Sequence, residues 1–363
     1  MSVEATIDAE SGTRQRTRRD GPSRRRSRTA DIRRVTAVLA IMLALLGVVE
    51  IGVRAIADRL PAPLVWHSYE AQRKVEQMDH LSATGVDVVF LGNSTMNAAV
   101  IPSLFESTIG RNITAYDAAL SSGTPRLMEA WGLHVVLPRL HPKLVVIGVS
   151  SGDVTDNGVG RTAFFDAFRD SAGGREALGR ESVVDHADRW LRDHLAVWDH
   201  RAELRDPATV VDALENKTPA GDPVADSVDP NGHLTNLDDV PYEATHKEGI
   251  AGVSAWAFGT EEPAALRRLI DGVRTTGAAV ALVDVPVTAD YIAVHPHGDA
   301  DYQAFKTDLA GLAASVRVPF FDLDQPRDHT FFADELHVNR RGATQFTTAL
   351  ARALQTNGAL PGE

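Results

Sequence analysis

The stretch "VVFLGNSTMNAAVIP", residues 88–102, governs the interpretation of the whole chain. Its first four residues are apolar without interruption, which is typical of a strand buried on both faces of a parallel sheet. The run ends at Gly92, Asn93 and Ser94, a small polar turn that leads into a helix-tolerant segment. A nucleophilic serine needs such a turn, because the turn places the serine beyond the end of the strand and leaves its backbone N–H without a hydrogen bond. The turn therefore raises the question of whether the chain supplies a base and an acid for Ser94.

Strands and helices are predicted to alternate along most of the chain. Uninterrupted apolar runs, which predict buried strands, cover 86–92, 112–120, 143–150, 278–287 and 318–323. Segments with helical signals cover 102–110, 125–140, 262–277, 302–316 and 340–355. Buried strands alternating with helices are typical of a parallel sheet covered on both faces. The predicted fold class is therefore α/β, a three-layer sandwich with a mostly parallel sheet, extending over 85–357.

Residues 160–255 interrupt the alternation and are rich in polar and charged residues. We interpret them as an insertion between the third and fourth strands, because long inserted loops in such folds often line a substrate cleft. Within it, 185–204 alternates charges around Trp190 and Trp198. This pattern predicts a surface helix with buried tryptophans, and the alternative is an aromatic platform for carbohydrate.

The N-terminal part of the chain carries a charge opposite to the rest. Residues 1–34 hold ten arginines and five acids, so the remainder is close to −17 within a total of −12. The segment 35–57 is apolar over nearly the ~20 residues that a membrane span needs. We expect a disordered basic cytoplasmic tail over 1–34, a signal-anchor helix over 35–57 and a helical neck over 58–84, with the body outside the cytoplasmic membrane. A cleaved signal peptide and a buried core helix are the alternatives.

Composition excludes several classes of function. The chain has no cysteine, so disulfides, thiolate zinc sites and iron–sulfur clusters are impossible. The acidic body is unsuited to nucleic acid, because phosphate contacts need a positive face. Association with DNA through the arginine tail rests on charge alone. The stretch "VHPHGDAD" at 294–301 has two histidines and two aspartates, but it is interpreted as a loop at the rim of the site, and no metal or cofactor is expected.

A base and an acid for Ser94 stand near the end of the chain, in "FFADELHVNRRGATQF" at 331–346. Serine is a weak nucleophile and needs a general base, which a carboxylate must hold in the right tautomer. Asp334 and His337 are three residues apart between the last strand and the closing helix. On a turn, this spacing lets the carboxylate accept a hydrogen bond from the imidazole. Helix capping by Ser94 and by Asp334 is the structural alternative.

The order Gly92-Asn93-Ser94 followed by Asp334-x-x-His337 resembles the SGNH (GDSL-like) hydrolases, whose fold is flavodoxin-like. The resemblance covers about 86 to the end, with Asn339 and Gly342 as common companions of the last block. The insertion and the single anchor look like the membrane-anchored envelope branch, similar to alginate O-acetyltransferase-like proteins. The resemblance implies that Ser94, Asp334 and His337 are catalytic.

The two middle blocks of that superfamily would fall on "AYDAALSSGTP" at 115–125 and "VIGVSSGD" at 146–153, and both depart from the usual pattern. The resemblance implies an oxyanion hole formed by the N–H groups of Ser94 and Ala119, with Gly152 in place of an asparagine. Losing one such donor costs about 10²–10³ in rate. Residues considered as substitutes for the missing side chain are Ser150, Ser151 and Asn157. Candidate substrate-binding residues are Asn93, Ser151, Asp153 and Asn339.

These features favour an extracytoplasmic serine esterase or O-acyltransferase that acts on acyl, above all acetyl, esters of cell-envelope glycans. The expected substrate is an acylated glycan or small acyl ester, and a membrane-bound acyl-donor protein is a possible partner. The alternative is a catalytically weak or inactive protein of this fold that binds glycans or assists assembly in the envelope.

Overall fold

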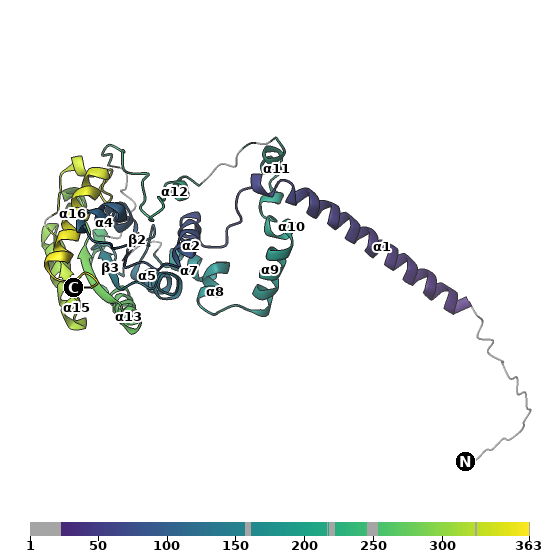
Figure 1. Cartoon of the computed structure of the whole chain (residues 1–363), viewed down its shortest axis with the longest axis horizontal. Coiled ribbons are helices and arrows are strands. Elements are labelled where there is room, and N and C mark those ends of the chain that lie inside the picture. Colours follow the sequence, from purple (N-terminus) through teal and green to yellow (C-terminus); the bar gives the residue numbers. More distant parts are fainter. Residues whose placement is uncertain are drawn as a thin grey trace, which may run out of the picture.

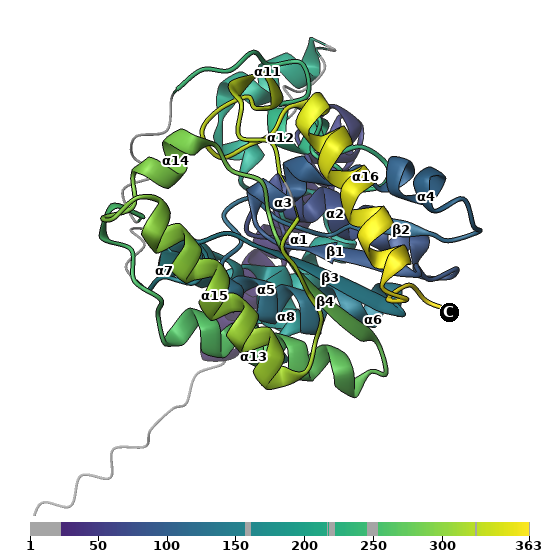
Figure 2. The same cartoon turned by 90° about the vertical axis from the view of Figure 1, so that its left-hand side faces the viewer.

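Five parallel strands form the centre of the domain in the order β2-β1-β3-β4-β5 (Figures 1 and 2). The computed structural model describes residues 23–156, 161–215, 217, 222–244, 253–323 and 325–362. The strands are β1 Val88–Leu91, β2 Ala115–Asp117, β3 Leu144–Val149, β4 Ala279–Asp284 and β5 Phe320–Phe321. Every strand pairing is parallel, and each strand falls inside a predicted run. The predicted α/β class with a parallel sheet is confirmed.

Helices cover both faces of this sheet (Figure 2). One face carries α3 Ser94–Ala99, α4 Pro102–Ile109 and α16 Arg340–Thr356. The other carries α2 Tyr69–Leu81, α5 Pro125–Trp131, a π-helical turn Gly132–Val136, α6 Leu137–Leu140, α13 Glu261–Thr275 and α15 Asp299–Val316. Side chains of β1 alternate between the two cores, with Val88 and Phe90 on the first side and Val89 and Leu91 on the second. This alternation follows from the two-residue period of a strand.

The segment predicted as a neck belongs largely to the domain itself. Its helix α2 begins at Tyr69 after the N-cap Ser68, whose hydroxyl accepts from the Ala71 N–H at 3.1 Å. The side chains of Ala71, Val75 and Met78 are buried in the core. The polar composition of 58–84 led to the prediction of a helical neck, and an apolar stripe along one side of α2 packs this helix against the domain.

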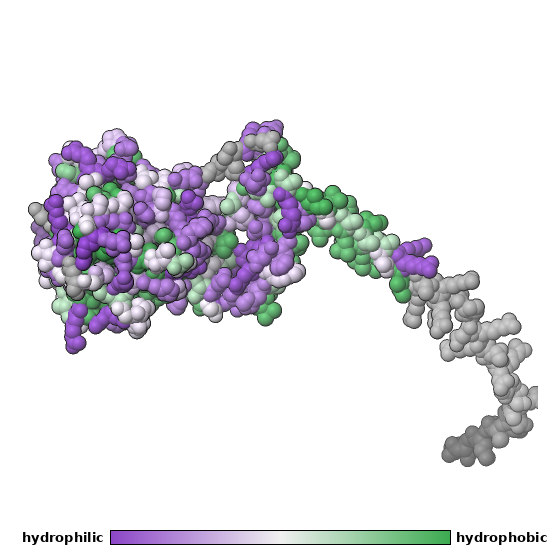
Figure 3. Space-filling model, in the orientation of Figure 1, coloured by the Kyte–Doolittle hydropathy of each residue, from purple (hydrophilic) through white to green (hydrophobic). Residues whose placement is uncertain are grey.

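The N-terminal helix α1, Ser23–Arg54, stands away from the domain (Figures 1 and 3). Its part Asp31–Arg54 is long and apolar enough to cross a membrane, and the most apolar stretch of 18 residues within it has no buried residue. Near its end, Val53 is buried against Leu60 and Ala213. Residues 1–22 of the predicted disordered tail lie outside the described residues, whereas 23–34 are helical and continue into α1, because no Gly or Pro follows Pro22 there.

The insertion between β3 and β4 is helical in pieces, as expected. Its helices are α7 Arg161–Asp170, α8 Ala172–Ala177, α9 Val183–His194, α10 Ala196–Asp199, α11 Pro207–Leu214 and α12 Pro223–Asp226. Further short elements are α14 Ala289–Ala293 and the 3₁₀ turns Ala57–Arg59, Glu203–Arg205, Val253–Ala255 and His329–Phe331. The prediction of buried tryptophans in this insertion is wrong, because Trp190 and Trp198 are both exposed.

Candidate active site

The side chains of Ser94, His337 and Asp334 form one hydrogen-bonded line. Nε2 of His337 lies 2.8 Å from Oγ of Ser94, and Nδ1 lies 2.8 and 3.0 Å from the two carboxylate oxygens of Asp334. Ser94 follows β1, and the other two residues precede α16. The carboxyl ends of parallel strands at the point where the strand order reverses, here between β1 and β3, are the usual ligand site of such a sheet. The arrangement can move a proton from the hydroxyl to the imidazole.

Two glycines, one just after β1 and one in β3, place Ser94 at its position. A Cβ at Gly92 would lie 2.4 Å from Cβ of Met96, and a Cβ at Gly148 would lie 2.4 Å from its Sδ. Both distances are far below ordinary contact, so a larger residue at either position would displace the side chain of Met96, and at Gly92 it would collide with the Cβ by which this side chain is attached to α3. The notch between β1 and β3 admits Met96 and thereby fixes the first turn of α3, in which Ser94 is the first residue.

The loop that carries the base is held by its own backbone. Oδ1 of Asp334 accepts from the N–H groups of Leu336 and His337 at 2.7 and 2.8 Å. Asn339 caps α16 by accepting from the N–H of Arg341 at 3.0 Å, and its amide nitrogen donates to two loop carbonyls. Asn339, predicted as a substrate-binding candidate, is therefore occupied in holding this loop.

The electrostatics favour an ionised Asp334. Burial opposes its charge, but the hydrogen bonds from the imidazole and from the two N–H groups outweigh burial and lower its pKa below the ordinary value. The side chain of His337 keeps 12% of its exposure, and that of Asp334 keeps 6%. A charged acceptor in a mostly dry position fixes the imidazole with Nδ1 as the donor and leaves Nε2 to face Ser94.

Asn93 and Asp153, two further substrate-binding candidates, are bonded to each other. Nδ2 of Asn93 donates to Oδ1 of Asp153 at 2.8 Å, and its Oδ1 accepts from the Thr95 N–H at 2.8 Å. The second oxygen of Asp153 accepts from the N–H and the hydroxyl of Ser150 at 2.7 and 2.8 Å. The pair ties the end of β1 to the end of β3, which positions the turn before Ser94.

The predicted oxyanion donors differ in availability. The N–H of Ala119 donates to Oδ1 of Asp117 at 2.9 Å, and the N–H of Gly152 donates to the Tyr291 hydroxyl at 3.0 Å. Either group would have to exchange its partner before binding an oxyanion. The N–H groups of Ser94 and Ser122, by contrast, donate to no acceptor among the residues that the structure describes. Asn157, considered as a substitute donor, lies outside the described residues.

Ser122 was not among the predicted site residues. It has φ of 61°, the left-handed region that is uncommon for residues other than glycine. The next residue, Gly123, packs against the turn before the nucleophile: a Cβ there would lie 2.8 Å from the Gly92 carbonyl oxygen and 3.4 Å from Cα of Asn93. The sequence signal was available in the small polar run 121–124, which follows a strand as the Gly-Asn-Ser turn does.

Two buried charged side chains of α2 support the same loop and were also missed. Nζ of Lys74 donates to the carbonyl oxygens of Asp117 and Ala119 at 3.0 and 2.6 Å and to Oδ1 of Asn97 at 2.9 Å. Glu70 accepts from the Ser121 N–H at 3.2 Å. Both side chains are buried, at a spacing of four residues beside the apolar stripe of α2, and that spacing is the signal.

The remaining candidates fall elsewhere in the fold. The hydroxyl of Ser151 is buried between Nε2 of His295 at 2.9 Å and the Tyr291 hydroxyl at 3.0 Å. Burial lowers the pKa of His295. His297 is exposed and pairs with Asp301 at 3.1 Å. Within the described residues, no group of three or more His, Asp or Glu side chains is arranged to hold a metal ion.

No protein-family model matches this chain, and no curated protein matches its sequence. Its fold is similar to that of a GDSL-like lipase from Bacteroides thetaiotaomicron, at 12% identity and TM-score 0.39, over 80% of this chain and 100% of that one. An acetylxylan esterase from Geobacillus stearothermophilus, solved as a catalytic mutant, has 12% identity and TM-score 0.36, over 74% and 93%. A carbohydrate acetylesterase family member from Sinorhizobium meliloti has 14% identity and TM-score 0.30, over 75% and 97%. Such low values identify neither the reaction nor the substrate of this chain.

Proposed function

We propose that the protein is a serine esterase or O-acyltransferase of the SGNH type. The observation that carries the proposal is the 2.8 Å contact between Nε2 of His337 and Oγ of Ser94, with Asp334 bonded to the opposite ring nitrogen. Nucleophile, base and orienting acid in hydrogen-bond reach are the geometric requirement for covalent acyl transfer. Two segments more than two hundred residues apart in the chain supply these groups.

In the proposed reaction, Oγ of Ser94 attacks the ester carbonyl carbon while His337 takes the hydroxyl proton. Asp334 stays ionised and stabilises the imidazolium that forms. The tetrahedral oxyanion collapses, the bond to the alcohol breaks, and His337 returns the proton to the leaving oxygen. The acyl group then stands on Ser94. Water, or a sugar hydroxyl, attacks it next and gives its proton to His337. The bond between the acyl carbon and Oγ of Ser94 then breaks, His337 returns the proton to this oxygen, and the acid or the new ester is released.

The oxyanion donors that we propose are the backbone N–H groups of Ser94 and Ser122. Neither has an acceptor among the described residues, and the loop of Ser122 lies against the turn before the nucleophile. Ala119, the donor implied by resemblance, contributes indirectly, because Asp117 and Lys74 hold its N–H and its carbonyl oxygen. Preorganised donors of this kind are often the largest single contribution to acyl transfer.

We further propose that the substrate is an acylated glycan of the cell envelope and that α1 anchors the enzyme in the cytoplasmic membrane. The arginines before the apolar segment and the acidic body after it support an N-terminus inside and a catalytic domain outside. In that place the enzyme would meet envelope polysaccharide, either acetylated, as an ester to be hydrolysed, or unacetylated, as an acceptor. In the transferase case, a membrane-bound protein would supply the acyl group.

The test is hydrolysis of an acetyl-ester chromogen by the full chain in detergent. Ser94→Ala should abolish turnover, whereas Ser107→Ala, a serine of α4 whose hydroxyl bonds only the Leu104 carbonyl oxygen at 2.9 Å, should leave it intact. Undiminished turnover by the Ser94→Ala variant would remove Ser94 from the mechanism. Adding an unacetylated glycan to the same assay then separates transfer from hydrolysis.

A second candidate function is a catalytically inactive glycan-binding or assembly protein. The observation in its favour is that the N–H groups of both Ala119 and Gly152 already have acceptors. Covalent labelling by a serine-directed phosphonate separates the two functions. Labelling of Ser94 supports the enzyme. An unlabelled Ser94, in a sample where an added serine hydrolase is labelled, supports the binding protein.

A further inference from the structure

Helix α9 presents its apolar side to solvent. Val183, Ala187 and Trp190 are spaced by four and three residues and therefore lie along one face. All three are exposed, Val183 at 85% and Trp190 at 57%, and Val184 beside them is exposed at 75%. A surface helix of a globular protein turns such a face toward the core. Helix α9 has the opposite orientation, with its apolar face toward solvent.

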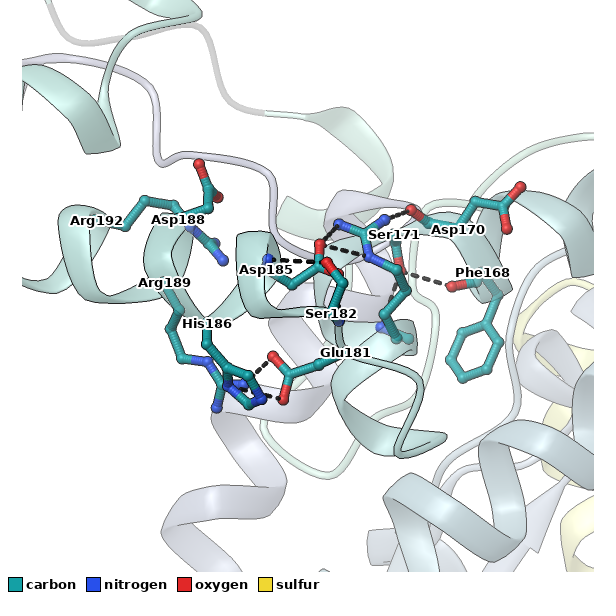
Figure 4. A network of polar contacts seen from close by, with 12 residues as sticks. Phe168, Asp170, Ser171, Glu181, Ser182, Asp185, His186, Asp188, Arg189 and Arg192 are labelled. Atoms are coloured by element: carbon teal, nitrogen blue, oxygen red, sulfur yellow. Dashed lines mark hydrogen bonds and ion pairs between the residues drawn. The ribbon is translucent and has the colours of Figure 1, made fainter.

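The opposite face of α9 is charged and makes the contacts with the rest of the insertion (Figure 4). Asp185 pairs with Arg175 at 2.9 Å, and Arg189 pairs with Glu176 at 2.7 Å. Asp188 pairs with Arg201 at 3.1 Å. A network of several ion pairs, together with the capping box at Ser182, fixes the rotation of the helix. The exposed apolar face is therefore set by specific contacts on the other side.

The end of α9 meets the end of the candidate membrane span. The Arg54 guanidinium donates to the His194 carbonyl oxygen at 2.7 Å. Just beyond, Glu50 accepts from the N–H groups of Ala196 and Val197 at 2.9 and 3.0 Å. Figure 1 shows α9, α10 and α11 lying across the end of α1. If α1 crosses a bilayer, its last turn brings these helices to the level of the lipid headgroups.

Exposed apolar side chains are concentrated in the same region. Outside α1, nine large apolar side chains of the described residues are exposed, and six of them lie within 183–214. These six are Val183, Val184, Trp190, Trp198, Val211 and Leu214. Tryptophan is enriched at membrane–water interfaces, where its ring is apolar and its N–H stays hydrated. A cluster of this kind beside a span is typical of a surface that lies on lipid.

We propose that the apolar face of α9, continued by the exposed side chains of α11, rests on the bilayer surface from which α1 emerges. The inference depends on the proposed anchoring by α1. Residues 181–215 carry nine acidic and four basic residues, so the attraction is apolar rather than electrostatic. The module formed by α9, α10 and α11 then holds the catalytic domain at a fixed distance from the membrane, because α9 is bound to both.

The absence of cysteine from the native sequence makes a single-label experiment possible. The full chain is reconstituted in phosphatidylcholine vesicles with Ala187→Cys, and an environment-sensitive fluorophore is attached. The matched control is Ala304→Cys, an exposed alanine of α15 at the far end of the domain. Quenching by a lipid-borne nitroxide should be severalfold stronger at 187 than at 304. Replacing part of the phosphatidylcholine by phosphatidylglycerol should not increase the signal at 187.

A third label separates failure of this inference from failure of the anchoring. Leu43→Cys lies inside the candidate span, so it should be quenched whenever α1 is inserted. Quenching at 43 with none at 187 would overturn the membrane contact of α9 and leave the anchoring intact. No quenching at 43 would overturn both.

Contact with protein instead of lipid has a separate signature. If α9 packs against another copy of the chain, the fluorophore at 187 is shielded from water but not quenched by lipid nitroxide, and its shielding falls as the chain is diluted in lipid. That result would also overturn the proposal. A second variant, Trp190→Glu combined with Ala187→Cys, should reduce quenching at 187 severalfold, whereas Asp193→Glu should not.

Discussion

The two sides of the candidate site differ in how their groups are used. On the side of the base, Asp334, His337 and Ser94 each have the partner that a proton relay requires. On the side of the oxyanion hole, the expected N–H groups of Ala119 and Gly152 are bonded to Asp117 and Tyr291. Roles carried by side chains can be identified from residue types, whereas roles carried by backbone N–H groups depend on the local conformation of a loop.

The largest expected effect is on kcat and comes from removing the general base of the proton relay. His337→Ala removes the base, and loss of the base in a serine hydrolase costs up to about 10⁶ in kcat. The hydrolysis rate of an acetyl-ester chromogen measures this effect. Circular dichroism should show an unchanged fold, because the ring of His337 is partly exposed. His329→Ala, a nearby histidine that pairs with Asp290 at 2.9 Å, should retain activity.

Asp334→Asn should impair the same proton relay less severely than His337→Ala. The amide cannot hold the imidazole in the tautomer that leaves Nε2 as the acceptor, and a loss of about 10⁴ in kcat is expected. KM should change much less, because Asp334 does not contact the substrate in the proposed reaction. A loss in KM alone, with kcat retained, would place Asp334 in substrate binding instead.

Substitutions at Ser122 test the oxyanion hole, which is the second side of the comparison. Its φ of 61° suits glycine and strains a β-branched residue. Ser122→Gly should keep the rate, whereas Ser122→Val should displace the N–H and lower kcat by about 10². Ser121→Val gives the matched control, because that residue has no positive φ. Equal rates in the Ser122→Gly and Ser122→Val variants would exclude the Ser122 N–H as an oxyanion donor.

The smallest expected effect concerns Asp117 and stability. Burial raises the pKa of Asp117 to about 7, so the folded chain keeps a proton that the unfolded carboxyl releases above about pH 4. The free energy of unfolding should therefore fall between about pH 4 and pH 7. Asp117→Asn should flatten this slope in denaturant titrations.

The matched control for that slope is Asp284→Asn, because burial also raises the pKa of Asp284 to about 7. Both variants should flatten the pH dependence of stability. Only Asp117→Asn should also change kcat, because Asp117 holds the Ala119 N–H whereas Asp284 accepts from the Tyr302 hydroxyl. An unaltered slope in both variants would mean that other groups determine it.

Much of the fold could be predicted because the strands are continuous apolar runs. The buried Val88–Leu91 segment, for instance, lies between two other strands of a parallel sheet and needs no alternation of polar and apolar residues. The segment of α2 was expected to be helical, but its packing into the core could not be predicted from the same signal. Glu70 and Lys74 made its sequence look solvated, and only their tertiary partners, Ser121 and Asn97, make their burial favourable.

The candidate site could be predicted in part for the same kind of reason. Asp334 and His337 lie three residues apart, so their contact is nearly local, and the line to Ser94 follows from the parallel sheet. The partners of Asn93 and Gly152 could not be predicted, because Asp153 and Tyr291 reach them through loops whose paths no residue pattern specifies. The outward apolar face of α9 was missed, because an amphipathic pattern predicts that a helix has an apolar face but not whether this face points to the core or to solvent.

The measurement that tests the central claim most directly is mass spectrometry of the full chain during turnover of an acetyl ester. A relay through Ser94 requires that the acetyl group stand on this serine between the two half-reactions. We expect the peptide containing Ser94 to be acetylated in the wild-type chain and unmodified in the His337→Ala variant. Steady hydrolysis with acetylation on another residue, or with the same acetylation in both chains, would contradict the relay.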